Sequence, residues 1–256
     1  MPYSPRLLFW DIETSHNLVA VFKLFKQDYI GHENLLQERF IICASWKWAE
    51  MTRVESVSGL DHMTRWLRKP HDDYHVVKTL HGVLSEADII VAHNGDRFDT
   101  KFVEARMIYH GMKPLPPLIS IDTLKVAKKR FLFNSNRLDY LGAYLGVGRK
   151  QPTTSGLWLR VLKGDRAAIR EMVRYNRRDV LLLERVFEKL RPYVAARLVS
   201  SVQNCPRCAA GRLQARGFQQ SLVATYQRYQ CLQCGGWSRK LKSEKEQGER
   251  PEVRPL

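Results

Sequence analysis

Acidic side chains occur in separated segments of this sequence at spacings that could bring them together. In an extended strand, Asp11 and Glu13 point to the same side, because side chains alternate with a period of two. In a helix, Tyr175 and Asp179 share a face, because residues four apart are neighbours there. A further acid, Asp99, lies where a strand gives way to a helix. Carboxylates this close repel one another unless a positive charge lies between them.

Four cysteines near the C-terminal end form a second group with chemical potential. They occur as Cys205-Pro-Arg-Cys208 and Cys231-Leu-Gln-Cys234, with 22 residues between the two pairs. Two such knuckles place four thiolates at the corners of a tetrahedron, which is the geometry that zinc prefers. Two disulfides are the alternative, but the N-terminus lacks the pattern of a secretory signal, so we favour zinc. The remaining cysteine, Cys43, stands in an apolar run and predicts a buried thiol.

The elements that must position these groups alternate along the chain. β-Branched and aromatic runs predict strands at 6–11, 18–24, 39–48, 51–58, 88–93 and 118–121. Helical periodicity predicts helices at 74–84, 99–111, 122–130, 138–145 and 166–190. Three strands followed by alternating helices and strands indicate the α/β class, with a mixed sheet flanked by helices.

Composition and charge restrict the class of protein and of partner. The chain has 42 Lys+Arg against 26 Asp+Glu, a net charge of +16, and 44% apolar residues, which is ordinary globular composition. No apolar stretch approaches the roughly 18 residues that would span a bilayer, so we expect a soluble cytoplasmic or other intracellular protein. The excess charge favours a polyanionic partner, although a solvated basic surface is the simpler alternative.

Local composition divides the chain into three parts. We expect one domain over 1–196, a zinc ribbon over 201–240 and a disordered tail over 243–256. No acidic residue occurs from 201 to 243, whereas the tail is of mixed charge without apolar periodicity. In the ribbon, Tyr226, Tyr229 and Trp237 alternate with basic residues, which suits either base stacking or a small apolar core.

The order of the acidic motifs resembles that of a known superfamily. Asp11-Ile-Glu13 ends the first strand, Asn94-Gly-Asp-Arg-Phe98-Asp99 follows a later strand, and Tyr175-Asn-Arg-Arg-Asp179 lies in a late helix. Together these motifs resemble the DEDD 3′–5′ exonucleases, which have a ribonuclease H-like fold. The tyrosine is typical of the DEDDy branch, and the similarity is greatest to the proofreading exonuclease domain of family B DNA polymerases. The resemblance covers about residues 5–192.

This resemblance implies a function for each matching residue. Two Mg²⁺ or Mn²⁺ ions are expected on the four acids, with one structural Zn²⁺ on the cysteines, and Tyr175 is expected to orient the attacking water. Thr14, Asn94 and Phe98 match positions that bind the terminal nucleotides or support the site, although Phe98 could instead belong to the core. The metal ligands implied by the resemblance are Asp11, Glu13, Asp99 and Asp179.

The function expected from the sequence is therefore metal-dependent 3′–5′ hydrolysis of phosphodiester bonds. DNA with a single-stranded or frayed end is favoured as substrate over RNA, with replication or repair proteins as further partners and no membrane partner. Two alternatives remain open: a structure-specific endonuclease or transposase-like nuclease of the same fold, and a non-catalytic nucleic-acid adaptor. The tyrosine motif speaks against the first alternative, and the presence of all four acids speaks against the second.

Overall fold

The computed structural model describes residues 5–25, 28–62, 69, 72–195, 204–221 and 224–241. These residues form two units, which we call the α/β unit, Arg6–Leu190, and the ribbon unit, which begins at Arg191. The tail expected over 243–256 lies outside the described residues.

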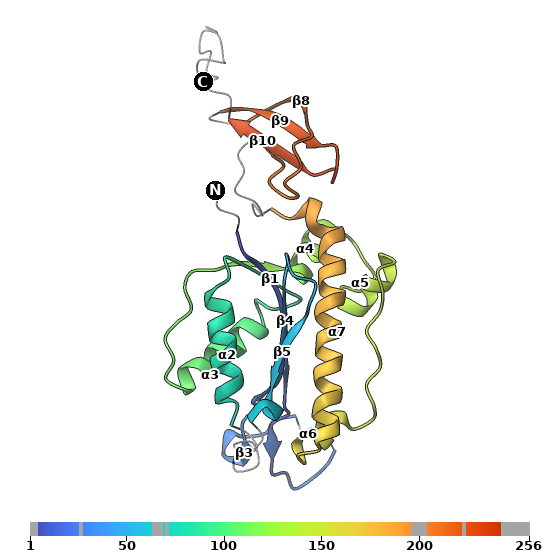
Figure 1. Ribbon diagram of the computed structural model, residues 1–256. Coiled ribbons are helices and arrows are strands. Elements are labelled where there is room, and N and C mark those ends of the chain that lie inside the picture. The colour runs from blue at the N-terminus through green and yellow to red at the C-terminus, as the bar shows by residue number, and fades with distance from the viewer. Residues whose placement is uncertain are drawn as a thin grey trace, which may run out of the picture. The chain divides into compact units, whose positions relative to one another are not determined.

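A five-stranded mixed sheet forms the centre of the α/β unit (Figure 1). Its strands, in spatial order, are β5 (Glu55–Ser58), β4 (Ile41–Trp48), β1 (Leu7–Thr14), β6 (Ile89–Ala92) and β7 (Ile119–Asp122). β1 runs antiparallel to β4 and parallel to β6, and β4 runs antiparallel to β5. The expected mixed sheet with an antiparallel beginning is confirmed.

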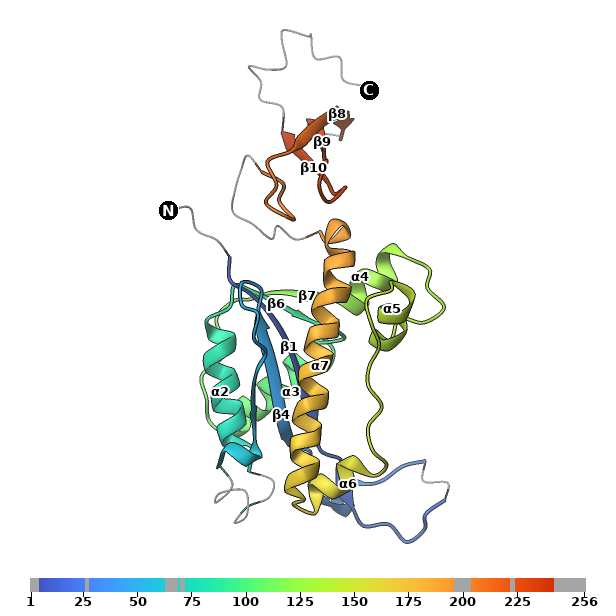
Figure 2. The same cartoon turned by 45° about the vertical axis from the view of Figure 1, so that its right-hand side comes forward.

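Helices cover both faces of this sheet, which explains why its central strands are buried along most of their length. α2 (Tyr74–Ser85) and α3 (Asp99–Tyr109) lie against one face, and α7 (Arg166–Leu190) lies against the other (Figures 1 and 2). In β1, Leu8, Trp10 and Ile12 join the core beneath α2 and α3. The alternate residue Phe9 meets Phe187 of α7 with 5.3 Å between ring centroids. By the same alternation, Asp11 and Glu13 face α7.

The long helix α7 carries the tyrosine motif, and its own ends are well defined. Asp165 accepts hydrogen bonds from the backbone N–H groups of Ala167 and Ala168, which satisfies donors at the start of the helix. The helix ends at Leu190, just before a proline that could not continue it. A buried ion pair of 2.5 Å between Lys47 Nζ and Glu184 Oε1 joins α7 to β4. No helix in the described part of the chain combines the length and apolar composition needed to cross a bilayer.

Smaller helices complete the side of the sheet on which α7 lies (Figure 2). α4 (Thr123–Arg130) and α5 (Leu138–Tyr144) follow β7, and α6 (Leu157–Leu162) precedes α7. Short 3-10 turns occupy His32–Asn34, Gly59–His62 and Arg191–Tyr193. α6 was not expected from the sequence, because six residues are too few to show a helical period.

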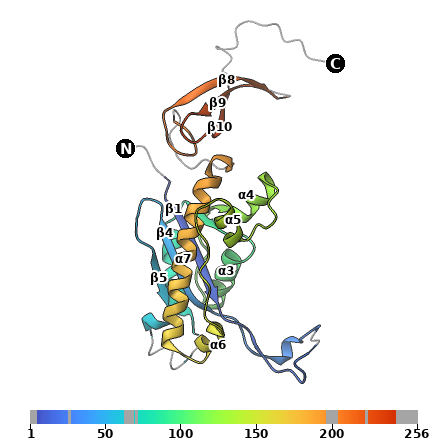
Figure 3. The same ribbon diagram turned by 90° about the vertical axis from the view of Figure 1, so that its right-hand side faces the viewer.

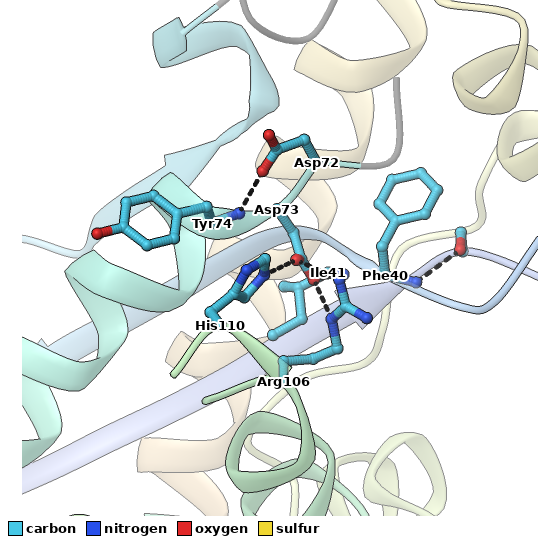
Figure 4. A network of polar contacts seen from close by, with 8 residues as sticks. Phe40, Ile41, Asp72, Asp73, Tyr74, Arg106 and His110 are labelled. Carbon is cyan, nitrogen blue, oxygen red and sulfur yellow. Dashed lines mark hydrogen bonds and ion pairs between the residues drawn. The ribbon is translucent and has the colours of Figure 1, made fainter. Parts of the chain in front are cut away.

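Asp73 ties α2 and α3 to the sheet through a buried polar network (Figure 4). Its side chain is fully buried and accepts hydrogen bonds from the Ile41 backbone N–H and from Arg106 Nε, at 2.9 and 2.8 Å. His110 Nε2 lies 2.7 Å from the other carboxylate oxygen. One carboxylate thus connects β4 with both helices on that face.

The segment after β1 departs from the sequence-based expectation. We expected a strand over 18–24, but only β2 (Leu18–Val19) pairs, with β3 (Leu35–Gln37). The following apolar side chains Phe22, Leu24 and Phe25 are exposed rather than buried, so periodicity alone misassigned them. This arm, residues 15–40 within the described ranges, projects from the end of the sheet (Figure 3).

The ribbon unit has a three-stranded antiparallel sheet and little buried apolar surface. Its strands are β8 (Leu213–Gln220), β9 (Thr225–Cys231) and β10 (Trp237–Leu241), in the order β10-β9-β8. The aromatic side chains do not form a closed core. Trp237 is 47% exposed, and the guanidinium groups of Arg228 and Arg239 lie over the rings of Trp237 and Tyr226.

Candidate active site and cysteine cluster

The acids meet at one edge of the sheet because three of its strands are parallel. β1, β6 and β7 run in the same direction, so their carboxyl ends share an edge, where ligands commonly bind in such sheets. Asn94 follows β6 with a left-handed φ of 67°, which asparagine tolerates. Its backbone N–H donates to Asp122 at the end of β7, and its carbonyl accepts from Phe98 N. This turn delivers Asp99 to the start of α3.

Three of the four predicted acids form one tight group. A carboxylate oxygen from each of Asp11, Glu13 and Asp179 lies within 4.8 Å of the others. Asp99 lies beside this group, is 3% exposed, and accepts a hydrogen bond of 3.2 Å from the Ile12 backbone N–H. We call these four residues the carboxylate site.

The carboxylate site holds more negative charge than its surroundings neutralise. Burial, followed by repulsion from Asp99, Glu13 and Asp179, raises the pKa of Asp11 well above its usual range. Burial and Asp179 likewise raise the pKa of Glu13 to about 8. Burial raises the pKa of Asp99 to about 7, although the N–H of Ile12 opposes the shift. The site therefore favours the binding of cations, whether protons or metal ions.

Lys150 supplies a positive charge that the motif search missed. Its Nζ lies 2.6 Å from Asp179 Oδ2 and 3.3 Å from the Tyr175 hydroxyl. Burial lowers the pKa of this lysine, but its attraction to Asp179 outweighs burial and raises it overall. Lys150 therefore remains charged beside the acids.

The loop that carries Lys150 is held by residues of α5. The Lys150 backbone N–H donates to Asp139 Oδ1 at 2.8 Å. Gly142 permits the loop to approach, because a Cβ atom at this position would lie 2.6 Å from the Gly148 carbonyl oxygen. The segment around Asp139 thus positions the lysine.

Asn176 is a second residue that sequence reasoning missed. This side chain of α7 is fully buried, and its Nδ2 donates to Asp11 Oδ2 at 2.6 Å. Its Oδ1 has no hydrogen-bond partner among the described residues. Asn176 lies within the recognised motif, between Tyr175 and Asp179, but the motif assigns no function to that position.

Tyr175 lies where its hydroxyl can act as a hydrogen-bond donor. Burial and the nearby Asp179 raise its pKa to about 12, so the phenol stays protonated at neutral pH. Its ring contacts Trp158 at 6.4 Å between centroids, edge to face, and Trp158 Nε1 donates to the Thr14 carbonyl at 3.2 Å. These contacts orient the tyrosine toward the carboxylate site.

A cleft of about 440 Å³ opens beside Glu13, and we call it the terminal cleft. Thr14 and Phe98, both singled out from the sequence, line this cleft together with Arg39 and Trp158. Arg39 donates to Thr14 Oγ1 and stacks over the Phe98 ring at 5.1 Å. Phe98 also packs against the core, so this side chain both lines the terminal cleft and contributes to the core.

Asn94 lines a different, larger cavity of about 750 Å³, which we call the lysine cavity. Lys150 reaches it, as do Arg97, Lys128 and Arg137, so its wall is basic. His93 also lines it, with Nδ1 2.9 Å from Thr123 Oγ1. Burial lowers the pKa of this histidine to about 4.

The neighbouring acid Asp96 lies outside the carboxylate site. Its carboxylate pairs with Lys125 at 2.7 Å and accepts from Ser120.

The carboxylate site fits a hard divalent cation by its donors and its charge. Carboxylate oxygens are the ligands that Mg²⁺ and Mn²⁺ prefer. The raised pKa values of Asp11 and Glu13 and the unpartnered Oδ1 of Asn176 show that the protein's own cations leave this site incompletely satisfied.

The four cysteines of the ribbon unit also converge. One sulfur from each lies within 4.8 Å of the others, and the Sγ atoms of Cys205–Cys234 and Cys208–Cys231 are each 3.7 Å apart. Zn–S bonds of about 2.3 Å arranged tetrahedrally place sulfurs about 3.8 Å apart. The cluster therefore suits zinc and is too open for disulfides.

Comparisons with known proteins agree with the fold. A family model of the RNase H superfamily matches residues 52–191. The solved structure of the family B DNA polymerase from the hyperthermophilic archaeon Pyrobaculum calidifontis is similar, with a TM-score of 0.53 and 19% sequence identity. The similar region covers 75% of this chain and 25% of the polymerase chain. A search of curated proteins finds no significant match. The chain belongs to the RNase H superfamily.

Proposed function

We propose that this protein is a metal-dependent 3′–5′ exonuclease of the DEDDy branch. The observation that carries the proposal is the convergence of Asp11, Glu13 and Asp179 within 4.8 Å, beside Asp99 and Tyr175. The RNase H superfamily supports a nuclease, and the tyrosine motif supports the direction and the branch.

Two Mg²⁺ or Mn²⁺ ions would be held by the four acids of the carboxylate site. Such ions supply Lewis-acid stabilisation of the attacking and leaving oxygens of an in-line displacement. Tyr175, which stays protonated, donates a hydrogen bond that orients the attacking water. Lys150 Nζ, 2.6 Å from Asp179, offers a fixed positive charge to the phosphate during the reaction.

The terminal cleft suits the 3′-terminal nucleotide. Phe98 and Trp158 offer aromatic surfaces for a base, and Arg39 offers a charge for a phosphate. The next nucleotides would pass through the lysine cavity, whose wall carries Arg97, Lys128 and Arg137. Glu13 of the carboxylate site lines the first space, and Lys150, the ion-pair partner of Asp179, lines the second.

DNA is the substrate that we favour, because the similar solved structure is that of a DNA polymerase. The ribbon unit would add a zinc-stabilised basic surface that contacts the phosphate backbone. Arginines lie over Trp237 and Tyr226, so we assign the ribbon to phosphate contact before base stacking.

The decisive experiment digests matched DNA and RNA oligonucleotides with free or blocked 3′ ends, with and without Mg²⁺. We expect stepwise release of mononucleotides from free 3′ ends only, with Mg²⁺ present. Internal cuts in a circular strand would support the endonuclease instead and overturn the proposal.

Two acidic variants make this experiment specific. Asp11→Ala should lower hydrolysis about a thousandfold or more, since metal ions contribute several kcal/mol to stabilising the transition state. Asp96 is a neighbouring acid that pairs with Lys125, and Asp96→Ala should leave the rate of hydrolysis within about twofold of that of the parent. Retention of activity by Asp11→Ala would contradict the assignment of this centre.

A further inference from the structure

An arginine-lined cleft on α7 is not used by the proposed active centre. It has a volume of about 380 Å³ and lies between α7 and the loop that precedes β5. Its basic lining residues are Arg53, Arg174, Arg177 and Arg178, and we call it the arginine cleft.

The guanidinium groups of this cleft form no ion pair with a described carboxylate. Among the described residues, no carboxylate lies within 4 Å of any of its four guanidinium groups. Arg177 donates to the Val54 carbonyl, and Arg178 donates to Gln151 Oε1. Glu171, one turn away, accepts hydrogen bonds from Thr154, and the charges of Arg160 and Arg174 add to these in lowering its pKa. Four like charges around one hollow favour an anionic ligand.

The arrangement suits phosphate groups in particular. A guanidinium group presents its N–H donors as a planar fork that matches the oxygens of a phosphate, and it is always charged. Arg53 and Arg174 are exposed and have no hydrogen-bond partner described within the protein. Both are therefore available to a ligand without loss of an internal contact.

We propose that the arginine cleft binds the phosphodiester backbone of the strand whose 3′ end lies in the active centre. The identity of that strand rests on the proposed function, whereas binding of a polyanion does not. At about 100° per residue, Arg178 lies roughly 60° and Arg174 roughly 100° around α7 from Tyr175. A strand that crosses the outer surface of this helix connects the two sites.

This placement predicts a minimum length of substrate. A helix with its side chains is about 10–12 Å across, so the path around it covers about 10–15 Å. With phosphates at about 3.4 Å or more along a strand, only oligonucleotides longer than about four residues can occupy both sites.

Binding is tested in an Asp11→Asn background, where hydrolysis is expected to stop. The probe is a fluorescent 20-nucleotide DNA strand, followed by anisotropy at several salt concentrations with Arg53→Ser/Arg174→Ser. We expect roughly tenfold weaker binding near 0.1 M salt. The slope of log affinity against log salt should fall by about 1.4, since each lost phosphate contact removes about 0.7.

The matched control is Lys78→Ser/Lys113→Ser, which removes the same charge from the region of α2 and α3, on the opposite side of the sheet. Its salt slope should remain that of the parent. If both double variants change affinity and slope equally, the cleft has no specific function in binding DNA and the proposal is wrong. The same result is expected if the cleft binds an acidic protein instead of DNA.

Hydrolysis by the protein that retains Asp11 provides the second measurement. The arginine double variant should lower kcat/KM for a 12-nucleotide strand about tenfold more than for a 3-nucleotide strand. Equal losses on both lengths would overturn the proposal, because a distal contact cannot affect a strand too short to reach it. If no strand is hydrolysed at all, the proposed function fails, while the binding measurement still tests the cleft.

Discussion

The two clusters of this protein, one of carboxylates and one of thiolates, are built in opposite ways. The carboxylate site lies on a sheet covered by helices on both faces, and its acids come from β1, α3 and α7. The thiolate cluster lies in a ribbon whose strand β8 is almost wholly exposed. In the first region the fold positions the ligands. In the ribbon unit, a metal ion bound by the four cysteines would be the main source of stability for the fold.

This difference follows from the burial available to each region. A segment of about 40 residues cannot bury enough apolar surface to offset its lost conformational entropy, so a metal commonly supplies the missing free energy. The α/β unit has an extensive core and can afford to collect like charges at the edge of its sheet. Repulsion within the carboxylate site lowers the stability of the α/β unit, and the core of that unit offsets the loss.

Removing one thiolate should have the largest effect. Cys231→Ser should release zinc and unfold the ribbon, because structural zinc binding contributes about 10–16 kcal/mol. The nuclease centre should survive, as measured by hydrolysis of short oligonucleotides. Zinc content per chain and protease susceptibility report the ribbon, and Cys43→Ser is the control because this buried cysteine lies in β4. Complete loss of short-substrate hydrolysis would show that the two regions are not independent.

Breaking the Asp73 network tests the α/β unit in the complementary way (Figure 4). Asp73→Ala leaves Arg106 and its partners uncompensated and should lower the free energy of unfolding by about 3–5 kcal/mol. Denaturant unfolding followed by tryptophan fluorescence measures this change, while zinc content should stay constant. Asp72→Ala, at the neighbouring half-buried edge of the network, removes a hydrogen bond from the Tyr74 backbone N–H and should cost far less. Equal destabilisation by both variants would contradict the importance assigned to Asp73.

Residues that assist the carboxylate site should have smaller effects on rate. Tyr175→Phe and Lys150→Met should each lower kcat about 10- to 100-fold, equivalent to roughly 1.4–2.7 kcal/mol. Lys128→Met, on the wall of the lysine cavity, should act mainly on KM, because its charge lies farther from the acids. Unchanged kcat in Lys150→Met would mean that its ion pair with Asp179 is only structural.

The last expected effect is a dependence of stability on pH. The folded-state pKa values of Glu13 and Asp99, about 8 and 7, exceed those of unfolded chains. Their contribution to stability is therefore present below about pH 4 and is lost as pH rises through 7 to 8. Without divalent metal, melting temperature should fall by about 10 °C between pH 5.5 and 8.5, because raised pKa values of this size imply a loss of several kcal/mol.

Magnesium and one variant isolate this effect. Mg²⁺ should raise the melting temperature more at pH 8.5 than at 5.5, because protons no longer compete for the carboxylates. Glu13→Gln, which is neutral throughout, should show a shallower fall with pH than the parent. An identical slope in the variant would remove Glu13 as its source.

Local patterns were sufficient for much of the fold. The apolar runs of β1, β4 and β6 and the helical stripe of α7 reflect burial against neighbouring elements, so they are visible in short windows. The arm after β1 was misassigned because apolar residues such as Phe22 and Phe25 follow a strand-like pattern but are exposed. A period reports which side chains could share a face, not whether anything covers that face.

The acids of the carboxylate site and the four cysteines could be named from sequence alone, because their motifs depend on short spacings that a strand, a helix or a knuckle imposes. Lys150, Asn176, Arg39 and Trp158 emerged only from the tertiary structure. Asn176 reaches Asp11 from 165 positions away, and Lys150 reaches Asp179 from a different loop. Such contacts depend on how α5 and α7 pack on the sheet. Packing is the sum of many weak, long-range contacts, and no local spacing records it.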